Sequence, residues 1–325
     1  MRPNTIHLAS IILLVPTFGT AIPSASAQEY PTKTIHFILP FSTGATNLVT
    51  RWLANKLESA LGQSVVVEPK TGAGGNIAHE AVAKASPDGY TLLVSGPPVA
   101  ANPHLYRNVG YDPERDYVAI ARIASMPNVL VVHPSVPAKN LKELTTLALK
   151  YPGKMSYASG GVGSAPHLGA ELFKSLTNTN ILHVPYRGGS LGLIDMMRGE
   201  IDMAVLAASA VTLYVKEKGI RGLAVLDEKH LVSLPQVPTS AEAGLPKLIV
   251  VNWYILFAPA GTPDKIVRRL NAETVKSIRA ADTLKRFSEL DIQSTPSSPE
   301  EAAEYLRMEY ARWGAVISKA GIRAN

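Results

Sequence analysis

The chain has 325 residues, of which 46% are hydrophobic and 18% charged, and this length suits two domains better than one. The formal charge is +6, but the basic residues are scattered and only 6% of residues are aromatic, so no nucleic-acid-binding surface is indicated. The chain contains no cysteine, which excludes disulfides, thiolate metal sites, a cysteine nucleophile and a lipid-modified N-terminal cysteine.

Residues 1–27 have the layout of a secretory signal peptide. Arg2 gives a short positive region, residues 8–15 are mostly apolar, and Ala25-Ser26-Ala27 offers a small-x-small cleavage site. The apolar run is far shorter than the roughly 20 residues that a membrane-spanning helix needs. We therefore expect a soluble protein that is exported to the periplasm and is not anchored by a lipid.

Strands and helices are predicted to alternate along the rest of the chain. We expect strands at 35–40, 65–67, 90–94, 129–132, 155–158, 181–184, 201–206, 223–225 and 249–258. Helices are expected at about 48–61, 76–84, 141–149, 167–175, 191–197, 264–280 and 300–319. This order predicts an α/β protein with a largely parallel sheet. Residues 28–127 plus 249–325 are expected to form a discontinuous domain 1 and residues 128–248 a domain 2, with a ligand cleft between them.

Three loops share one pattern, in which a strand is followed by glycine with serine, threonine or asparagine and then by a helix. They lie at 42–47, 71–76 and 159–164. Glycine allows a close backbone approach, and free N–H groups at a helix N-terminus bind a carboxylate or phosphate. Helix capping alone would also explain any single loop, but the recurrence in both expected domains favours an anion site.

Signals for catalysis are weak. Ser164 lacks the Gly-x-Ser-x-Gly context of a hydrolase nucleophile, and His167 follows it on the same expected helix. The sequence has no metal-ligand spacing, no phosphate-binding loop motif and no complete dinucleotide fingerprint, so we expect no cofactor and no metal. A protein that is not an enzyme is the main expectation, and a secreted hydrolase on the same scaffold is the alternative.

Ordered motifs along the mature chain resemble one known family. They are Tyr30-Pro31, Pro40-Phe41, VVVE at 65–68, GAGGNI at 72–77, PDGYTL at 87–92, NPHLY at 102–106, HVPYRG at 183–188, VPTSAEAG at 237–244, APAGTP at 258–263 and RWG at 312–314. Together they resemble the extracytoplasmic receptors of tripartite tricarboxylate transporters, the Bug (Bordetella uptake gene) family.

The resemblance implies a type II periplasmic-binding-protein fold and a monomer that captures a small carboxylate between its domains. It implies membrane transporter subunits, or a sensing system, as partners, and no nucleic acid. The ligand-binding residues that it implies are Phe41, Ser42, Thr43, Gly44, Ala45, Thr46, Asn47, Asn76, Ser95, Gly96, Ser159, Gly163, Ser164, His167, Tyr186 and Gly188.

Two departures from the family pattern bear on the ligand. The first loop is one residue shorter than usual and has Asn47 where the family has aspartate, so an ammonium group would lose its partner there. Leu206 and Ala207 replace a usual Asp-Asn pair, which suggests a more apolar distal pocket. These departures favour a mono- or dicarboxylic acid, aliphatic or aromatic, over an amino acid.

Overall fold

The computed structural model describes residues 30–186 and 189–324. Residues 31–325 form one unit, and the segment 1–30 is a separate unit. The expected signal peptide at 1–27 lies outside the described residues, as does Gly188. No helix of the described part is long and apolar enough to cross a membrane.

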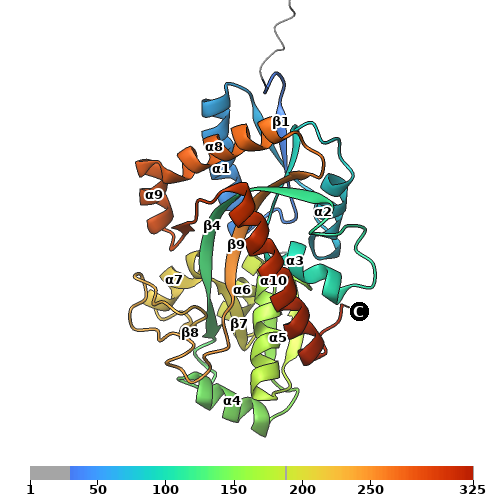
Figure 1. The fold of residues 1–325 in the computed structure, drawn as a ribbon. Helices are drawn as coiled ribbons and strands as arrows, with labels where there is room; N and C mark the ends of the chain where they lie inside the picture. Colours follow the sequence, from blue (N-terminus) through green and yellow to red (C-terminus); the bar gives the residue numbers. More distant parts are fainter. Residues whose placement is uncertain (1–29, 187–188, 325) are drawn as a thin grey trace, which may run out of the picture. The chain divides into compact units, whose positions relative to one another are not determined.

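The described chain alternates between strands and helices (Figure 1). The first elements are β1 (Ile35–Leu39), α1 (Ala45–Leu61), β2 (Val65–Pro69), the 3-10 helix η1 (Ala73–Gly75), α2 (Asn76–Ala83), β3 (Thr91–Ser95), α3 (Pro97–Leu105) and β4 (Tyr117–Val132). They are followed by α4 (Leu141–Lys150), β5 (Ser156–Ser159), α5 (Ala165–Thr177), β6 (Leu182–Pro185), α6 (Gly189–Met197), β7 (Met203–Ala207), α7 (Ala208–Lys216) and β8 (Arg221–Val225). The last are β9 (Val251–Pro259), α8 (Asp264–Arg279), α9 (Ala281–Ser288), β10 (Gln293–Ser294) and α10 (Pro299–Ala320).

The strands form a sheet with the order β2-β1-β3-β9-β4-β7-β5-β6, and β8 and β10 also pair with β4. Strand β4 has 16 residues and belongs to both parts of the sheet. Its residues 117–127 pair with β9, and its residues 128–132 pair with β7 and β8. We call the part built on β1–β3, β9, β10 and residues 117–127 the first half, and the part built on residues 128–132 and β5–β8 the second half.

The expected largely parallel sheet is present only within each half. Strands β2, β1 and β3 are parallel, as are β6, β5 and β7. Strands β4 and β9 are antiparallel to each other and to their neighbours β7 and β3. The reason is connectivity, because a strand that leaves the first half and a strand that returns to it must run in opposite directions.

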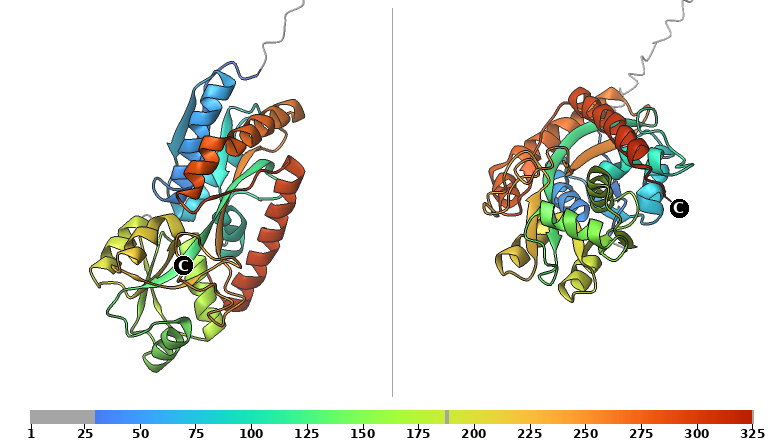
Figure 2. Two further views of the ribbon diagram at one scale, coloured as in Figure 1. Left: turned by 90° about the vertical axis from the view of Figure 1, so that its left-hand side faces the viewer. Right: turned by 90° about the horizontal axis from the view of Figure 1, so that it is seen from below.

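Each half has its own hydrophobic core, and α10 contributes to both. The first core includes Ile38 and Phe257, and the second includes Phe173 and Val205. Leu306 of α10 packs in the first core, whereas Trp313 and Ile317, further along the same helix, pack in the second. Figures 1 and 2 show α10 running from the first half past α3 to the side of α5. The domain boundaries expected from the sequence therefore stay a prediction, because one helix packs on both sides of them.

Three α-helices, the 3-10 helix η1, the two-residue strand β10 and part of β4 were not expected. Helix α3 contains Pro97, Pro98 and Pro103 and is buried on almost every side, so it has no polar face to reveal its period. Helices α7 and α9 are short. Residues 117–128 of β4 include Pro127, a residue that argues against a central strand. Pro127 is accommodated where β4 changes partners, opposite Val251.

Candidate functional site

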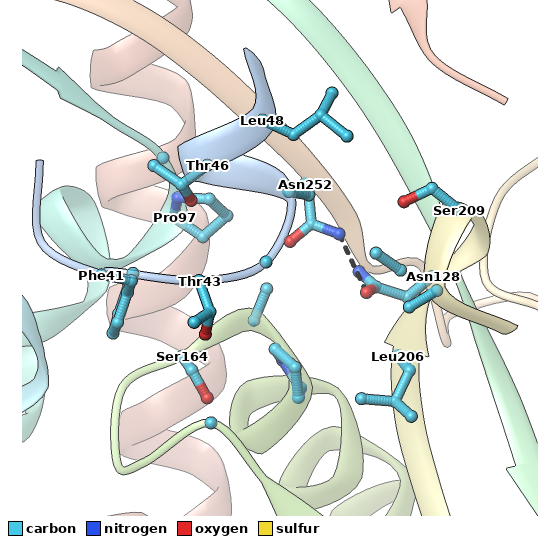
Figure 3. A pocket seen from close by; sticks show the side chains of 18 of the residues that line it. Phe41, Thr43, Thr46, Leu48, Pro97, Asn128, Ser164, Leu206, Ser209 and Asn252 are labelled. Atoms are coloured by element: carbon cyan, nitrogen blue, oxygen red, sulfur yellow. Dashed lines mark hydrogen bonds between the residues drawn. The ribbon is translucent and has the colours of Figure 1, made fainter. Parts of the chain in front are cut away.

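A cavity of about 350 Å³ lies between the two halves. Its lining residues come from the β1–α1 loop, the start of α3, β9, the β5–α5 loop and the β7–α7 junction, with Asn128 of β4 between them (Figure 3). They are Phe41, Thr43, Gly44, Ala45, Thr46, Leu48, Gly96, Pro97, Pro98, Asn128, Gly160, Ser164, Ala165, Pro166, Leu206, Ala207, Ser209, Ala210, Asn252 and Tyr254.

The N-termini of α1, α3, α5 and α7 all border this cavity. The residues that precede α1, α3 and α7 make no capping hydrogen bond from their side chains. Their first-turn N–H groups and the positive ends of their dipoles therefore stay available to an anion. Prolines 97, 98 and 166 remove some of the donors of α3 and α5, so α1 and α7 carry most of the free N–H groups.

The side chains that line the first cavity in the described part of the chain are uncharged. Among the described residues that line it, none is Asp, Glu, His, Lys or Arg. Its polar groups are the hydroxyls of Thr43, Thr46, Ser164, Ser209 and Tyr254, the amides of Asn128 and Asn252, and the backbone. Such a surface can bind a carboxylate through oriented dipoles, without an ion pair.

A second cavity of about 470 Å³ adjoins the first and shares Phe41, Thr43 and Gly160 with it. The glycine-rich segment at 71–75 borders only this second cavity, together with Gly161 and Tyr186. The first loop thus reaches both cavities, the second loop reaches one, and the third reaches both through residues 160–164.

The structure brings many, but not all, of the residues expected from the sequence to these cavities. The first cavity is lined by Phe41, Thr43, Gly44, Ala45, Thr46, Gly96 and Ser164, and the second also by Ser42 and Tyr186. The residues that line neither cavity are Asn47, Asn76, Ser95, Ser159, Gly163 and His167. The side chain of Asn47 accepts a hydrogen bond from Nε of Arg51 at 2.9 Å and does not cap α1.

Several of the residues behind the cavity hold the loops in place. Asn102 donates from Nδ2 to the carbonyl of Gly74 at 3.0 Å and to Oδ1 of Asn76 at 2.7 Å. Ser159 is fully buried, and its hydroxyl is hydrogen-bonded to Nε2 of His183 at 2.6 Å. These bonds lie within one half each, and they fix the backbone that faces the cavity.

Ser164 and His167 stabilise the third loop. The Ser164 hydroxyl donates to the carbonyl of Gly161 at 2.6 Å and accepts from the His167 backbone N–H at 3.4 Å. Nδ1 of His167 accepts from the Gly163 N–H at 3.3 Å. Burial, helped by the neighbouring His183, lowers the pKa of His167 to about 4. The imidazole is therefore neutral, and the hydrogen bonds of Ser164 and His167 do not join the ring to the Ser164 hydroxyl as a general base would require.

Sequence reasoning missed Asn128, Ser209, Asn252 and Tyr254. Asn252 interrupts the otherwise largely apolar strand β9, and Asn128 directly precedes the apolar run 129–132 of β4. This position in or beside an apolar run is the signal that could have identified them, because a polar side chain on a buried strand needs a partner.

Comparison with known proteins places this site in context. Residues 49–322 match the family model described as tripartite tricarboxylate transporter family receptor. Protein BugT of Bordetella pertussis is 32% identical over 319 residues, which cover 97% of this chain and 98% of BugT. The structure of R. palustris Rpa4515 with adipate is similar with a TM-score of 0.85 and 34% identity, over 91% of this chain and 99% of that one. The structure of MatC from Rhodopseudomonas palustris with bound malate is similar with a TM-score of 0.84 and 29% sequence identity, over 89% of this chain and 100% of that one.

Proposed function

Because this chain belongs to the receptor family of the tripartite tricarboxylate transporters, which includes the Bug proteins, we propose that it captures a small carboxylate in the cavity between its two halves. The family consists of solute-binding receptors. The proposed place of capture is outside the cytoplasm, and the proposed recipients are membrane transporter subunits or a sensing system.

The observation that carries the proposal is the meeting of uncapped helix N-termini around a cavity whose described lining residues are all uncharged. Peptide N–H groups are donors only, so they favour a group that accepts several hydrogen bonds. A carboxylate does so and also interacts favourably with the positive ends of the helix dipoles. Among the described residues that line the cavity, none has a carboxylate that could pair with a cation.

The relatives support the same ligand class. One structure of similar fold is described with adipate and another with malate. Both are small aliphatic dicarboxylates. Each covers about nine-tenths of this chain, at 34% and 29% identity respectively.

We assign the ligand carboxylate to the end of the cavity formed by the first and third loops. Thr43 and Ser164, one from each half, both line the cavity there and are labelled in Figure 3. Gly44 has φ +82°, and no heavy atom lies within 4 Å of the position of a Cβ on it. A glycine at this point leaves room for a ligand oxygen to approach the N–H groups of α1.

Thermal unfolding of the mature chain in the presence of aliphatic and aromatic carboxylic acids tests the proposal. A true ligand at about 100 times its dissociation constant should stabilise the protein by roughly 2.7 kcal/mol. Alcohols with the same carbon skeleton are the controls and should give no stabilisation. Equal effects of acid and alcohol, or no effect of any acid, would contradict carboxylate capture.

A further inference from the structure

Two asparagine side chains form a buried pair in the wall of the first cavity. Nδ2 of Asn252 donates to Oδ1 of Asn128 at 2.9 Å and to the carbonyl of Met126 at 3.4 Å. Nδ2 of Asn128 donates to the carbonyl of Val250 at 2.8 Å. Backbone carbonyls only accept hydrogen bonds, so those of Met126 and Val250 fix which end of each amide is nitrogen. The orientation of both amides is therefore determined by the fold.

This arrangement leaves Oδ1 of Asn252 unused. It receives no hydrogen bond from any residue that the structure describes, although Asn252 is only 9% exposed. In Figure 3 this oxygen points into the cavity, on the side of the amide away from Asn128. Because Asn252 lines the cavity, solvent can reach this oxygen as long as the cavity holds no ligand. A ligand that displaces this solvent without supplying a donor leaves the acceptor unpaired, at a cost of about 1–3 kcal/mol, so a ligand that carries a donor is favoured.

The rest of this wall can accept several kinds of group. Leu206 and Ala210 are apolar, and the hydroxyls of Ser209 and Tyr254 can donate or accept. The first N–H groups of α7 can donate a hydrogen bond to a ligand oxygen, whether it belongs to a hydroxyl, an amide or a carboxylate. The Asn252 oxygen, by contrast, can only accept a hydrogen bond. It therefore favours a ligand group that donates one and disfavours an anion.

We propose that Asn252 is a specificity-determining residue that selects monocarboxylates whose far end carries a neutral hydrogen-bond donor, a hydroxyl or an amide N–H. A second carboxylate would lose its hydration in a cavity whose described lining residues include no Lys or Arg, and it would face the Asn252 oxygen. The inference rests on the proposed function, since it assumes that the first carboxylate is held by the loops at the other end.

Isothermal titration with three acids of equal length tests the inference on the mature chain. The acids are 6-hydroxyhexanoate, hexanoate and adipate, together with the matching sets that are one carbon shorter and longer. We expect the hydroxy acid of the best-fitting set to bind about tenfold more tightly than either of the others, a difference of about 1.4 kcal/mol. Adipate or hexanoate binding as tightly as the hydroxy acid would overturn the inference while supporting carboxylate capture. Binding by none of these acids would instead contradict the proposed function, and the inference with it.

The variant Asn252→Leu separates the role of this oxygen from the rest of the site. The readout is the ratio of the affinities for 6-hydroxyhexanoate and hexanoate within the variant, because a general change in the site alters both affinities alike. The tenfold preference for the hydroxy acid should fall to about one. A preference that persists in a variant that still binds hexanoate would show that Ser209 or Tyr254 reads the hydroxyl, and would overturn the assignment to Asn252.

Discussion

The side-chain oxygen of Asn102 occupies the space that a Cβ atom on Gly163 would need, only 2.1 Å from its ideal position. Asn102 belongs to α3 of the first half, and Gly163 to the third loop in the second half. A Cβ on Gly74 would likewise lie 2.5 Å from the carbonyl oxygen of Val162. The two halves therefore meet beside the cavities through backbone that only glycine allows to approach so closely.

Replacing Gly163 with alanine should weaken ligand binding by roughly tenfold. The added methyl group must displace Asn102 or the third loop, and Gly163 has φ +84°, which disfavours any side chain. The conformation in which both halves contact the ligand would then be less populated. Titration of the ligand into Gly163→Ala measures the effect.

Gly62→Ala is the matched control. Gly62 ends α1 with φ +67°, and a Cβ there would meet nothing within 4 Å. It should lower stability by about 1 kcal/mol, as expected for a left-handed alanine, and leave the affinity unchanged. Equal losses of affinity in both variants would contradict a role for the Asn102–Gly163 contact.

The cap of α5 should affect both stability and binding. The Ser164 hydroxyl accepts from the His167 N–H and lines the cavity. Ser164→Ala should cost about 1 kcal/mol of unfolding free energy and should weaken binding by at least several-fold. Ser298 makes the corresponding bond to the Glu301 N–H at 3.1 Å on α10, and it does not line the cavity. Ser298→Ala should show a similar loss of stability in denaturant titrations, with no loss of affinity.

Protonation of His167 should destabilise the folded protein in mild acid. Its pKa is lowered by burial from 6.5 to about 4, so the unfolded chain binds the proton more readily than the folded one. Its contribution to stability is complete above pH 6.5 and is lost as the pH falls from 6.5 towards 4. The loss amounts to about 3 kcal/mol at most, at about 1.4 kcal/mol per pH unit.

His167→Asn isolates this contribution, since fully buried His79, whose pKa is lowered to about 3, titrates over an overlapping range. Unfolding free energies measured across this range should depend less steeply on pH in the variant than in the natural protein. Identical slopes would show that His167 does not carry the effect.

Glu309 should be important for stability rather than for the ligand. It is buried on α10 and accepts from the indole N–H groups of Trp253 at 2.8 Å and Trp313 at 3.1 Å, while Arg312 donates to its other oxygen at 2.9 Å. Glu309→Gln replaces one acceptor oxygen with a donor, and we expect a loss of about 1.5–3 kcal/mol in chemical denaturation. Glu304→Gln, which alters an exposed pair with Arg307, should cost less than about 1 kcal/mol. A comparable loss in both variants would refute the special role of Glu309.

Asn47→Asp tests the interpretation of the shortened first loop. The carboxylate would meet the guanidinium of Arg51, the partner of Asn47, rather than the ligand. We therefore expect the variant to gain no affinity for amino acids over the matching unsubstituted acids. A gain seen by titration would mean that residue 47 faces the ligand when it is bound.

Much of the fold could be predicted because its signals are local. The apolar positions that predict α1 are neighbours in the sequence, and so are Ser298 and Pro299, which predict the start of α10. Both helices end within two residues of the expected position. Pro127 and the prolines of α3 misled the prediction, since tertiary packing outweighs their usual effect. The antiparallel passage of β4 and β9 follows from how the halves connect, which no local pattern records.

The same distinction holds for the site. Gly44 and Ser164 could be found because a glycine or serine before a helix has a chemical meaning by itself. Asn128 and Asn252 could not, because each becomes meaningful only when the other lies opposite it, 124 residues away in the sequence. The shared family motifs add residues such as Asn76 and Ser159, which support the loops from behind.

The proposed binding of a carboxylate by peptide dipoles, with no lysine or arginine among the described lining residues, has a consequence for the conditions in which capture can occur. Amide, hydroxyl and main-chain groups keep the same protonation state from mildly acidic to mildly alkaline surroundings. Acidification would then lower the affinity mainly because the carboxyl group of the solute becomes protonated and neutral. The side chains that line the cavity would not change their protonation state. Such a receptor would report the ionised fraction of a nutrient rather than its total amount.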